Sequence, residues 1–189
     1  MGFLAAKKAK ESGPTGDLSS RLAAVRRCPA APREAEGPAA PDQRAGAVAA
    51  LDACLRIVAD ASAIMRDAAA HVITAASEPD EGARALLAER YDDARRRIDA
   101  MQAELAEEAG SLMGPGAAAL DVPLRGAVYA VAPFPLDTGE AGLDLPPPED
   151  GFATHQEVAE TLRRVELALE RLSRVRAIYT ADRAFLSRS

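Results

Sequence analysis

The stretch from residue 155 to residue 187 constrains the fold most strongly, because it predicts one long amphipathic helix. Apolar side chains recur there in steps of four and three, the spacing of a coiled-coil seam, at Val158, Leu162, Val165, Leu169 and Leu172. Glu and Arg fill the opposite side. A helix of this length is on the order of 45 Å long and cannot bury such a stripe on itself. The rest of the chain must therefore supply partner helices.

Two earlier segments have the same periodicity. A helix is expected from about residue 47 to 76, with one stripe at Leu51, Leu55, Val58, Ser62, Met65, Ala69 and Val72, and a second at Cys54, Ile57, Ala61, Ile64 and Ala68. Another is expected from about 81 to 109, apolar at Leu87, Tyr91, Ala94, Ile98, Met101 and Leu105. We interpret the charged residues 90–99 of this helix as a solvated outer face. The short segment SEPDEG joins the two helices, so they should run antiparallel.

Residues 117–152 have a different character, with short β-prone pieces divided by Gly and Pro. Strands are expected around 120–124 and 127–131, and a third piece around 142–145. With one Arg against six acidic residues, this is the most acidic part of the chain. It predicts one or two small hairpins that cap one end of a helical rod.

The first 44 residues are rich in Pro and Ala and predict a disordered basic arm with one short possible helix over 17–27. The remaining domain, 46–187, is expected to be mainly α. Its predicted architecture is an elongated, coiled-coil-like bundle of three long helices with a small β-hairpin and loop cap.

Composition narrows the possible partners. The chain has 189 residues and a formal net charge of −6, of which residues 1–45 contribute +3, so the remainder is strongly acidic. An acidic body argues against nucleic acid as the main partner. No apolar run approaches the roughly 20 residues that span a bilayer, and the opening MGFLAAKKAK does not have the order of a secretory signal.

The sequence offers little for catalysis. Cys28 and Cys54 have neither metal-site nor redox spacing, and His71 has no second His or Cys three or four residues away. Phosphate-binding Gly loops, nucleophile motifs and the Glu-x-x-His couple of di-iron bundles are not found in the sequence. We therefore expect no enzymatic activity, no cofactor, no metal and no small-molecule substrate.

The order of these parts resembles the helical rod domain of bacterial flagellins and flagellin-like hook-associated proteins. The resemblance covers about residues 46 to 187. It rests on LLAERYDDARRRIDAM in the second helix, LDVPL and GLDLPPPEDGF in the insertion, and the Leu169–Phe185 part of the last helix. In that family two helices from the N-terminal half pack with one from the C-terminal half, and β-hairpins cap the rod. The helices that build the inner filament tube in the family have no counterpart here, so ordinary filament assembly is in doubt.

The resemblance implies a non-enzymatic structural protein of the bacterial flagellum, exported without a cleavable signal. Such a protein would associate with itself or with flagellin-type subunits through its rod surface. The candidate contact residues are Arg176, Tyr179, Arg183 and Phe185, although Tyr179 and Phe185 have the alternative of closing the core of the bundle itself. Two other functions stay open: a cytoplasmic adaptor or regulator that mimics the rod and binds flagellar chaperones or flagellins, and an unrelated helical-bundle interaction protein.

Overall fold

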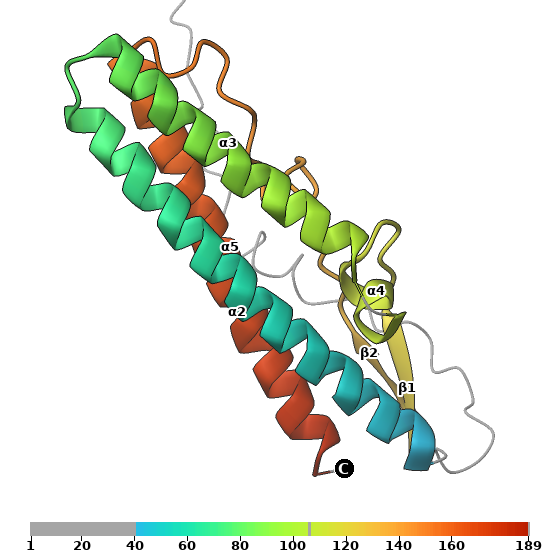
Figure 1. The fold of residues 1–189 in the computed structure, drawn as a ribbon. Helices are drawn as coiled ribbons and strands as arrows, with labels where there is room; N and C mark the ends of the chain where they lie inside the picture. The colour runs from blue at the N-terminus through green and yellow to red at the C-terminus, as the bar shows by residue number, and fades with distance from the viewer. Residues whose placement is uncertain (1–40, 106, 189) are drawn as a thin grey trace, which may run out of the picture. The chain divides into compact units, whose positions relative to one another are not determined.

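Four helices and one β-hairpin make up the part of the chain that the computed structural model describes, residues 41–105 and 107–188 (Figure 1). In chain order the elements are α2 (Pro41–Ser77), α3 (Glu81–Ala103), α4 (Glu107–Met113), β1 (Leu120–Leu124), β2 (Ala127–Val131) and α5 (His155–Leu186). The mainly α class is confirmed, with a two-stranded antiparallel sheet. The predicted arm is described only from Pro41 onward, and the helix predicted over 17–27 lies outside the described residues.

The helix boundaries differ from those expected at two places. The first long helix begins at Pro41 rather than near 47, because Pro suits the first turn of a helix, where its missing N–H is not needed. The second ends at Ala103 rather than at 109. No Gly or Pro interrupts the sequence there, and the break instead redirects the chain so that Ala109, Leu112 and Met113 become buried, with α4 packed against α2. Tertiary packing overrides helix propensity at this point.

Helix α2 is the central element, because it packs against α3, α5, α4 and β1. The turn after Ser77 is closed by Asp80, whose carboxylate accepts a hydrogen bond from the N–H of Ala83 at 2.8 Å and caps α3. Thr154 caps α5 in the same way through the N–H of Glu157 at 3.2 Å. Both α3 and α5 run antiparallel to α2 (Figure 1).

The buried seam follows a seven-residue repeat in which every second predicted position, such as Val58 or Leu172, is buried as expected. At most of the positions between them the buried residue precedes the expected one, as Ala168 precedes Leu169, and on α2 these residues belong to the predicted second stripe. On α2 the buried positions are Leu51, Cys54, Val58, Ala61, Met65, Ala68, Val72 and Ala75; on α5 they are Val158, Val165, Ala168, Leu172, Val175, Tyr179 and Leu186. The expected seam residues Leu55, Ser62, Ala69, Leu162 and Leu169 are only partly buried. Small side chains, mostly alanine, occupy every second seam position of α2, which lets the helix backbones approach closely. The larger leucines therefore pack along the flanks.

A long connection over residues 132–153, here called the 132–153 segment, is hydrogen-bonded to both α3 and α5. The Nε of Arg95 on α3 donates to the carbonyl of Leu145 at 2.7 Å, and the carboxylate of Asp99 accepts from the N–H of Thr138 at 2.9 Å. The interpretation of residues 90–99 as a solvated face is therefore wrong for Arg95, whose side chain is only 13% exposed, whereas Asp99 stays exposed although it also binds Thr138. Four apolar side chains of the segment are buried: Leu136, Leu143, Leu145 and Phe152. The expected strand over 142–145 is absent; the segment turns there instead, with Asp144 at a φ of 57°.

Candidate protein-interaction surface

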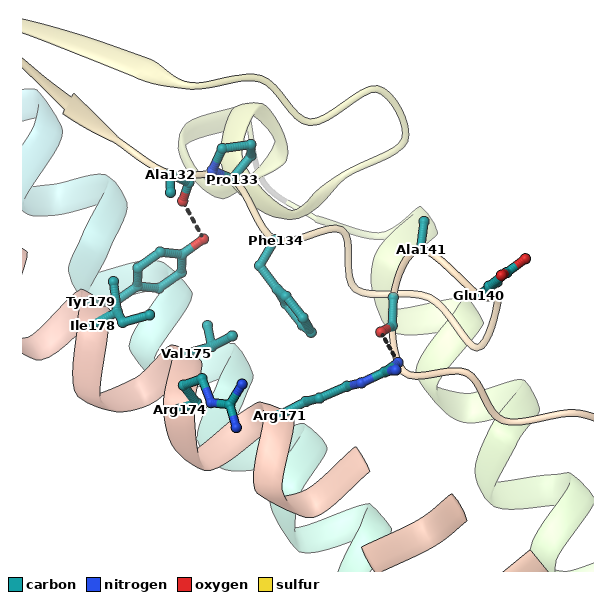
Figure 2. Close-up of a pocket in the computed structure, with 11 residues that line it drawn as sticks. Ala132, Pro133, Phe134, Glu140, Ala141, Arg171, Arg174, Val175, Ile178 and Tyr179 are labelled. Carbon is teal, nitrogen blue, oxygen red and sulfur yellow. Dashed lines mark hydrogen bonds between the residues drawn. The ribbon is translucent and has the colours of Figure 1, made fainter. Parts of the chain in front are cut away.

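A groove of about 380 Å³ lies between α5 and the first half of the 132–153 segment (Figure 2). One wall comes from α5: Arg171, Arg174, Val175, Ile178 and Tyr179. The other comes from the connection: Ala132, Pro133, Phe134, Glu140, Ala141 and Gly142. The Phe134 ring projects from the second wall toward α5 in Figure 2. Apolar side chains and rings thus form most of the floor, and charged groups stand toward one end.

Two hydrogen bonds hold the walls together. The hydroxyl of Tyr179 donates to the carbonyl of Ala132 at 3.2 Å, and Nη1 of Arg171 donates to the carbonyl of Gly142 at 2.9 Å (Figure 2). Burial raises the pKa of Tyr179 well above its usual value, because the ionised phenolate would lose its hydration. The hydroxyl therefore stays protonated and remains a donor at neutral pH. Both walls are fixed by side chains of the same helix, so the groove is preformed.

The lining suits an apolar side chain better than a reaction. Its ionisable side chains are Glu140, Arg171, Arg174 and Tyr179, and it contains no Ser, Cys or His. Ile178 is 44% exposed at the edge of the groove, and Arg174 is ion-paired with Glu170 at 2.8 Å. Elsewhere in the described residues, no group of three or more His, Cys, Asp or Glu side chains is arranged to hold a metal ion.

The exposed apolar surface continues from the groove toward the hairpin. The Tyr129 ring of β2 lies on the ring of Phe185, with centroids 4.6 Å apart, and the Tyr129 hydroxyl donates to Asp182 at 2.6 Å. These contacts tie β2 to α5, yet Phe185 remains 41% exposed and Val128 of β2 42% exposed. We call the groove together with Tyr129 and Phe185 the α5–hairpin surface; the side chain of Val128, next to Tyr129 in β2, points to the other face of the hairpin.

The four contact residues predicted from the sequence do not form one patch. Tyr179 is buried at 1% exposure and therefore lies in the core of the bundle, which was the alternative considered for it. Arg183 is directed to α2, where its guanidinium pairs with Asp52. Arg176 is exposed but does not line the groove. Phe185 alone of the four presents a large exposed apolar surface, although Tyr179 contributes its hydroxyl and part of its ring to the groove wall.

Sequence reasoning missed the residues that give this surface its shape. Ile178 belongs to the broadened stripe of the last helix, and the pattern alone did not separate it from the buried Val175 beside it. Tyr129 and Phe134 belong to the Gly- and Pro-divided insertion, where alternation within AVYAV was the one available signal. Their position beside α5 depends on contacts between residues about fifty positions apart in the chain, such as the 53-residue separation between Tyr129 and Asp182.

Comparison of the chain with protein-family models, with curated proteins and with solved structures gives no match. Within residues 41–105 and 107–188, no helix is both long and apolar enough to cross a membrane.

Proposed function

We propose that this chain is a non-enzymatic structural protein of the flagellin-like rod type. In this proposal it associates with itself or with flagellin-type subunits of the bacterial flagellum through the α5–hairpin surface, and it is exported without a cleavable signal. The observation that carries the proposal is the groove between α5 and the 132–153 segment, which is lined mostly by apolar side chains and in which Ile178 is 44% exposed. Exposed apolar side chains grouped in this way are typical of protein-binding surfaces.

The arrangement of the helices supports the rod type. Two helices from the first half of the chain, α2 and α3, are joined by a short turn, and α5 from the second half packs along α2. The hairpin lies beside the end of α5, through the contacts of Tyr129 with Asp182 and Phe185. These are the relations that the sequence resemblance implies for a coiled-coil-like rod with a β cap.

The test is the fate of the tagged full chain in the bacterium that encodes it. Sheared filaments, cell envelope and cytosol are separated, and the chain is quantified in each fraction. We expect it in the filament fraction together with flagellin. Recovery from the cytosol alone, with a flagellar chaperone or flagellin bound to it, would replace the structural proposal with the adaptor function.

A matched pair of α5 variants shows whether the α5–hairpin surface is responsible. Ile178→Asp places a charge at the edge of the groove, and Leu167→Asp places one on α5 at a similarly exposed residue, 40% against 44%, that does not line the groove. We expect Ile178→Asp to lose filament association and Leu167→Asp to keep it. Equal behaviour of the two variants would place the contact on another surface.

A further inference from the structure

The turn before α5 contains Asp150 followed by Gly151, the one Asp–Gly pair in the sequence. The main chain of Asp150 is held in place, because its N–H donates to the carboxylate of Glu157 and its carbonyl accepts from the N–H of Ala153, both at 3.2 Å. Its side chain is exposed, and within residues 41–105 and 107–188 no group bonds to its carboxylate. The N–H of Gly151 likewise has no acceptor among these residues. A carboxylate and the next amide nitrogen are thus both free to react.

These two groups can close a ring. The nitrogen of Gly151 loses its proton and bonds to Cγ of Asp150, one C–O bond of the carboxyl group breaks, and water leaves, so that a succinimide remains. Glycine favours this step because it has no Cβ beside the attacking nitrogen. Water then opens the ring: addition at Cγ restores aspartate, whereas addition at the main-chain carbonyl carbon gives isoaspartate, in which the chain runs through Cγ. Water is the one co-reactant, and the composition of the protein is unchanged.

We propose that Asp150 is a site of spontaneous isomerisation in the folded protein, and that its product releases the hydrogen bonds that follow it. Arg84 donates from Nε to the carbonyl of Phe152 at 2.8 Å and from Nη2 to that of Ala153 at 2.7 Å. Phe152 is fully buried and has a φ of 61°, so the path of the chain into Arg84 is tightly specified. Isoaspartate adds a methylene carbon to this path and leaves a charged carboxylate as the side group. The two carbonyls then no longer match the guanidinium. The inference does not depend on the proposed function.

The other aspartates of the chain lack this combination, because each is followed by a residue with a side chain. Asp137, which also lies outside the helices, is the matched comparison. Its carboxylate accepts from the N–H of Gly139 at 2.8 Å, and the next amide, that of Thr138, donates to Asp99 at 2.9 Å. Both of its reacting groups are engaged, so isomerisation should be confined to residue 150.

The first test is incubation of the folded full chain at neutral pH and physiological temperature, followed by peptide mapping. Isoaspartate is recognised by unchanged mass, altered elution and methylation by an isoaspartyl methyltransferase. We expect it to accumulate at residue 150 and not at Asp137. Asp150→Glu should accumulate none there, because glutamate would have to close a larger ring. A chain without isoaspartate at residue 150, or one with equal amounts at Asp137, would overturn the inference.

The second test concerns the consequence for Arg84. Aged chain is separated by ion exchange into unmodified and isomerised fractions, and urea unfolding is measured for each. We expect the isomerised fraction to unfold at a lower urea concentration. In an Arg84→Met background, where the guanidinium is already missing, the two fractions should unfold alike. Equal midpoints in the wild-type background, or the same difference in both backgrounds, would overturn the release of the Arg84 hydrogen bonds.

Discussion

Arg84 is a buried cation whose hydrogen-bond acceptors, among residues 41–105 and 107–188, are all backbone carbonyls, and it joins three parts of the chain. Its side chain is about as buried as a core residue, at 6% exposure. Nε and Nη2 donate to the carbonyls of Phe152 and Ala153 at 2.8 and 2.7 Å, and Nη1 donates to those of Glu78 and Pro79 at 3.1 and 3.0 Å. Phe152 has a φ of 61°, in the left-handed region that is unusual for a bulky residue. The guanidinium thus fixes the α2–α3 turn and holds the end of the 132–153 segment in a strained conformation.

Replacing Arg84 by Met should destabilise the fold by about 2–4 kcal/mol, because four carbonyls lose their donor while the apolar stem is retained. Urea unfolding measures the difference. The matched control is Arg90→Met on the same helix, an exposed position where a change within about 0.5 kcal/mol is expected. Similar losses for the two variants would mean that the clamp at Arg84 contributes nothing specific.

Cys54 should make the free energy of unfolding depend on pH in the alkaline range. The thiol is fully buried in the α2 seam, and burial raises its pKa from 9.0 to about 11. When the pKa of a group is higher in the folded than in the unfolded chain, its contribution to stability is fully present at a pH below the unfolded-state pKa. The contribution is lost as the pH rises through the folded-state pKa. We expect the free energy of unfolding to fall between about pH 9 and about pH 11, and Cys54→Ala to fall less steeply over this window.

Urea unfolding of both proteins across this pH range, under reducing conditions, is the measurement. The tyrosines contribute in the same direction at higher pH, because burial also raises the pKa of Tyr91, to about 12. They are present in both proteins, so the difference between the two slopes reports the thiol. Parallel slopes would contradict the buried position of Cys54.

Among the elements, the α2–α5 seam supplies most of the continuous core, and its phase is testable. Leu172 is fully buried and Leu167 is 40% exposed on the same helix. Leu172→Ala should cost about 2–5 kcal/mol, and Leu167→Ala should lie within about 0.5 kcal/mol of the parent. Leu162→Ala and Leu169→Ala should fall between these, because both side chains are only partly buried. Chemical denaturation ranks the four variants, and a larger loss at Leu169 than at Leu172 would contradict the burial of Leu172 and the partial exposure of Leu169.

The sequence predicts the long helices well because each carries many repeats of one pattern. It also predicts every second seam position correctly, among them Val165 and Leu172. Between them Ala168 is buried where Leu169 was expected, because alanine is compatible with either side of a helix. The break between α3 and α4 is not encoded by a local signal at all, as good helix formers continue through it.

The irregular conformation of the 132–153 segment can be predicted from its composition, but its course along the helices cannot. Its Gly and Pro residues exclude long regular elements, and the hairpin at its start follows from two β-prone pieces and a two-residue turn. Its course is set by side chains from distant helices, among them Arg95 of α3 and Arg171 of α5. The groove is formed by this course, which is why the four residues predicted from the last helix alone include only part of the surface.

Taken as a whole, residues 41–105 and 107–188 combine a helical core with exposed large apolar side chains on α2, α3, β2 and α5. The core requires the seven-residue repeat of α2 and α5, the 132–153 segment completes one wall, and the hairpin extends the exposed surface along α5. Backbone carbonyls of the 132–153 segment, together with the side chains of Thr138 and Asp144, attach it to the helices.

Binding of protein partners at the groove is best tested with a photo-crosslinking amino acid at residue 178, introduced in cells that carry flagella. The control carries the same amino acid at residue 167. Both positions are similarly exposed on α5, but only residue 178 borders the groove. We expect the adduct at residue 178, identified by mass spectrometry, to contain a second copy of this chain or a flagellin-type subunit. Residue 167 should give little adduct. Adducts at 167 but not at 178, or none with either partner at 178, would contradict it.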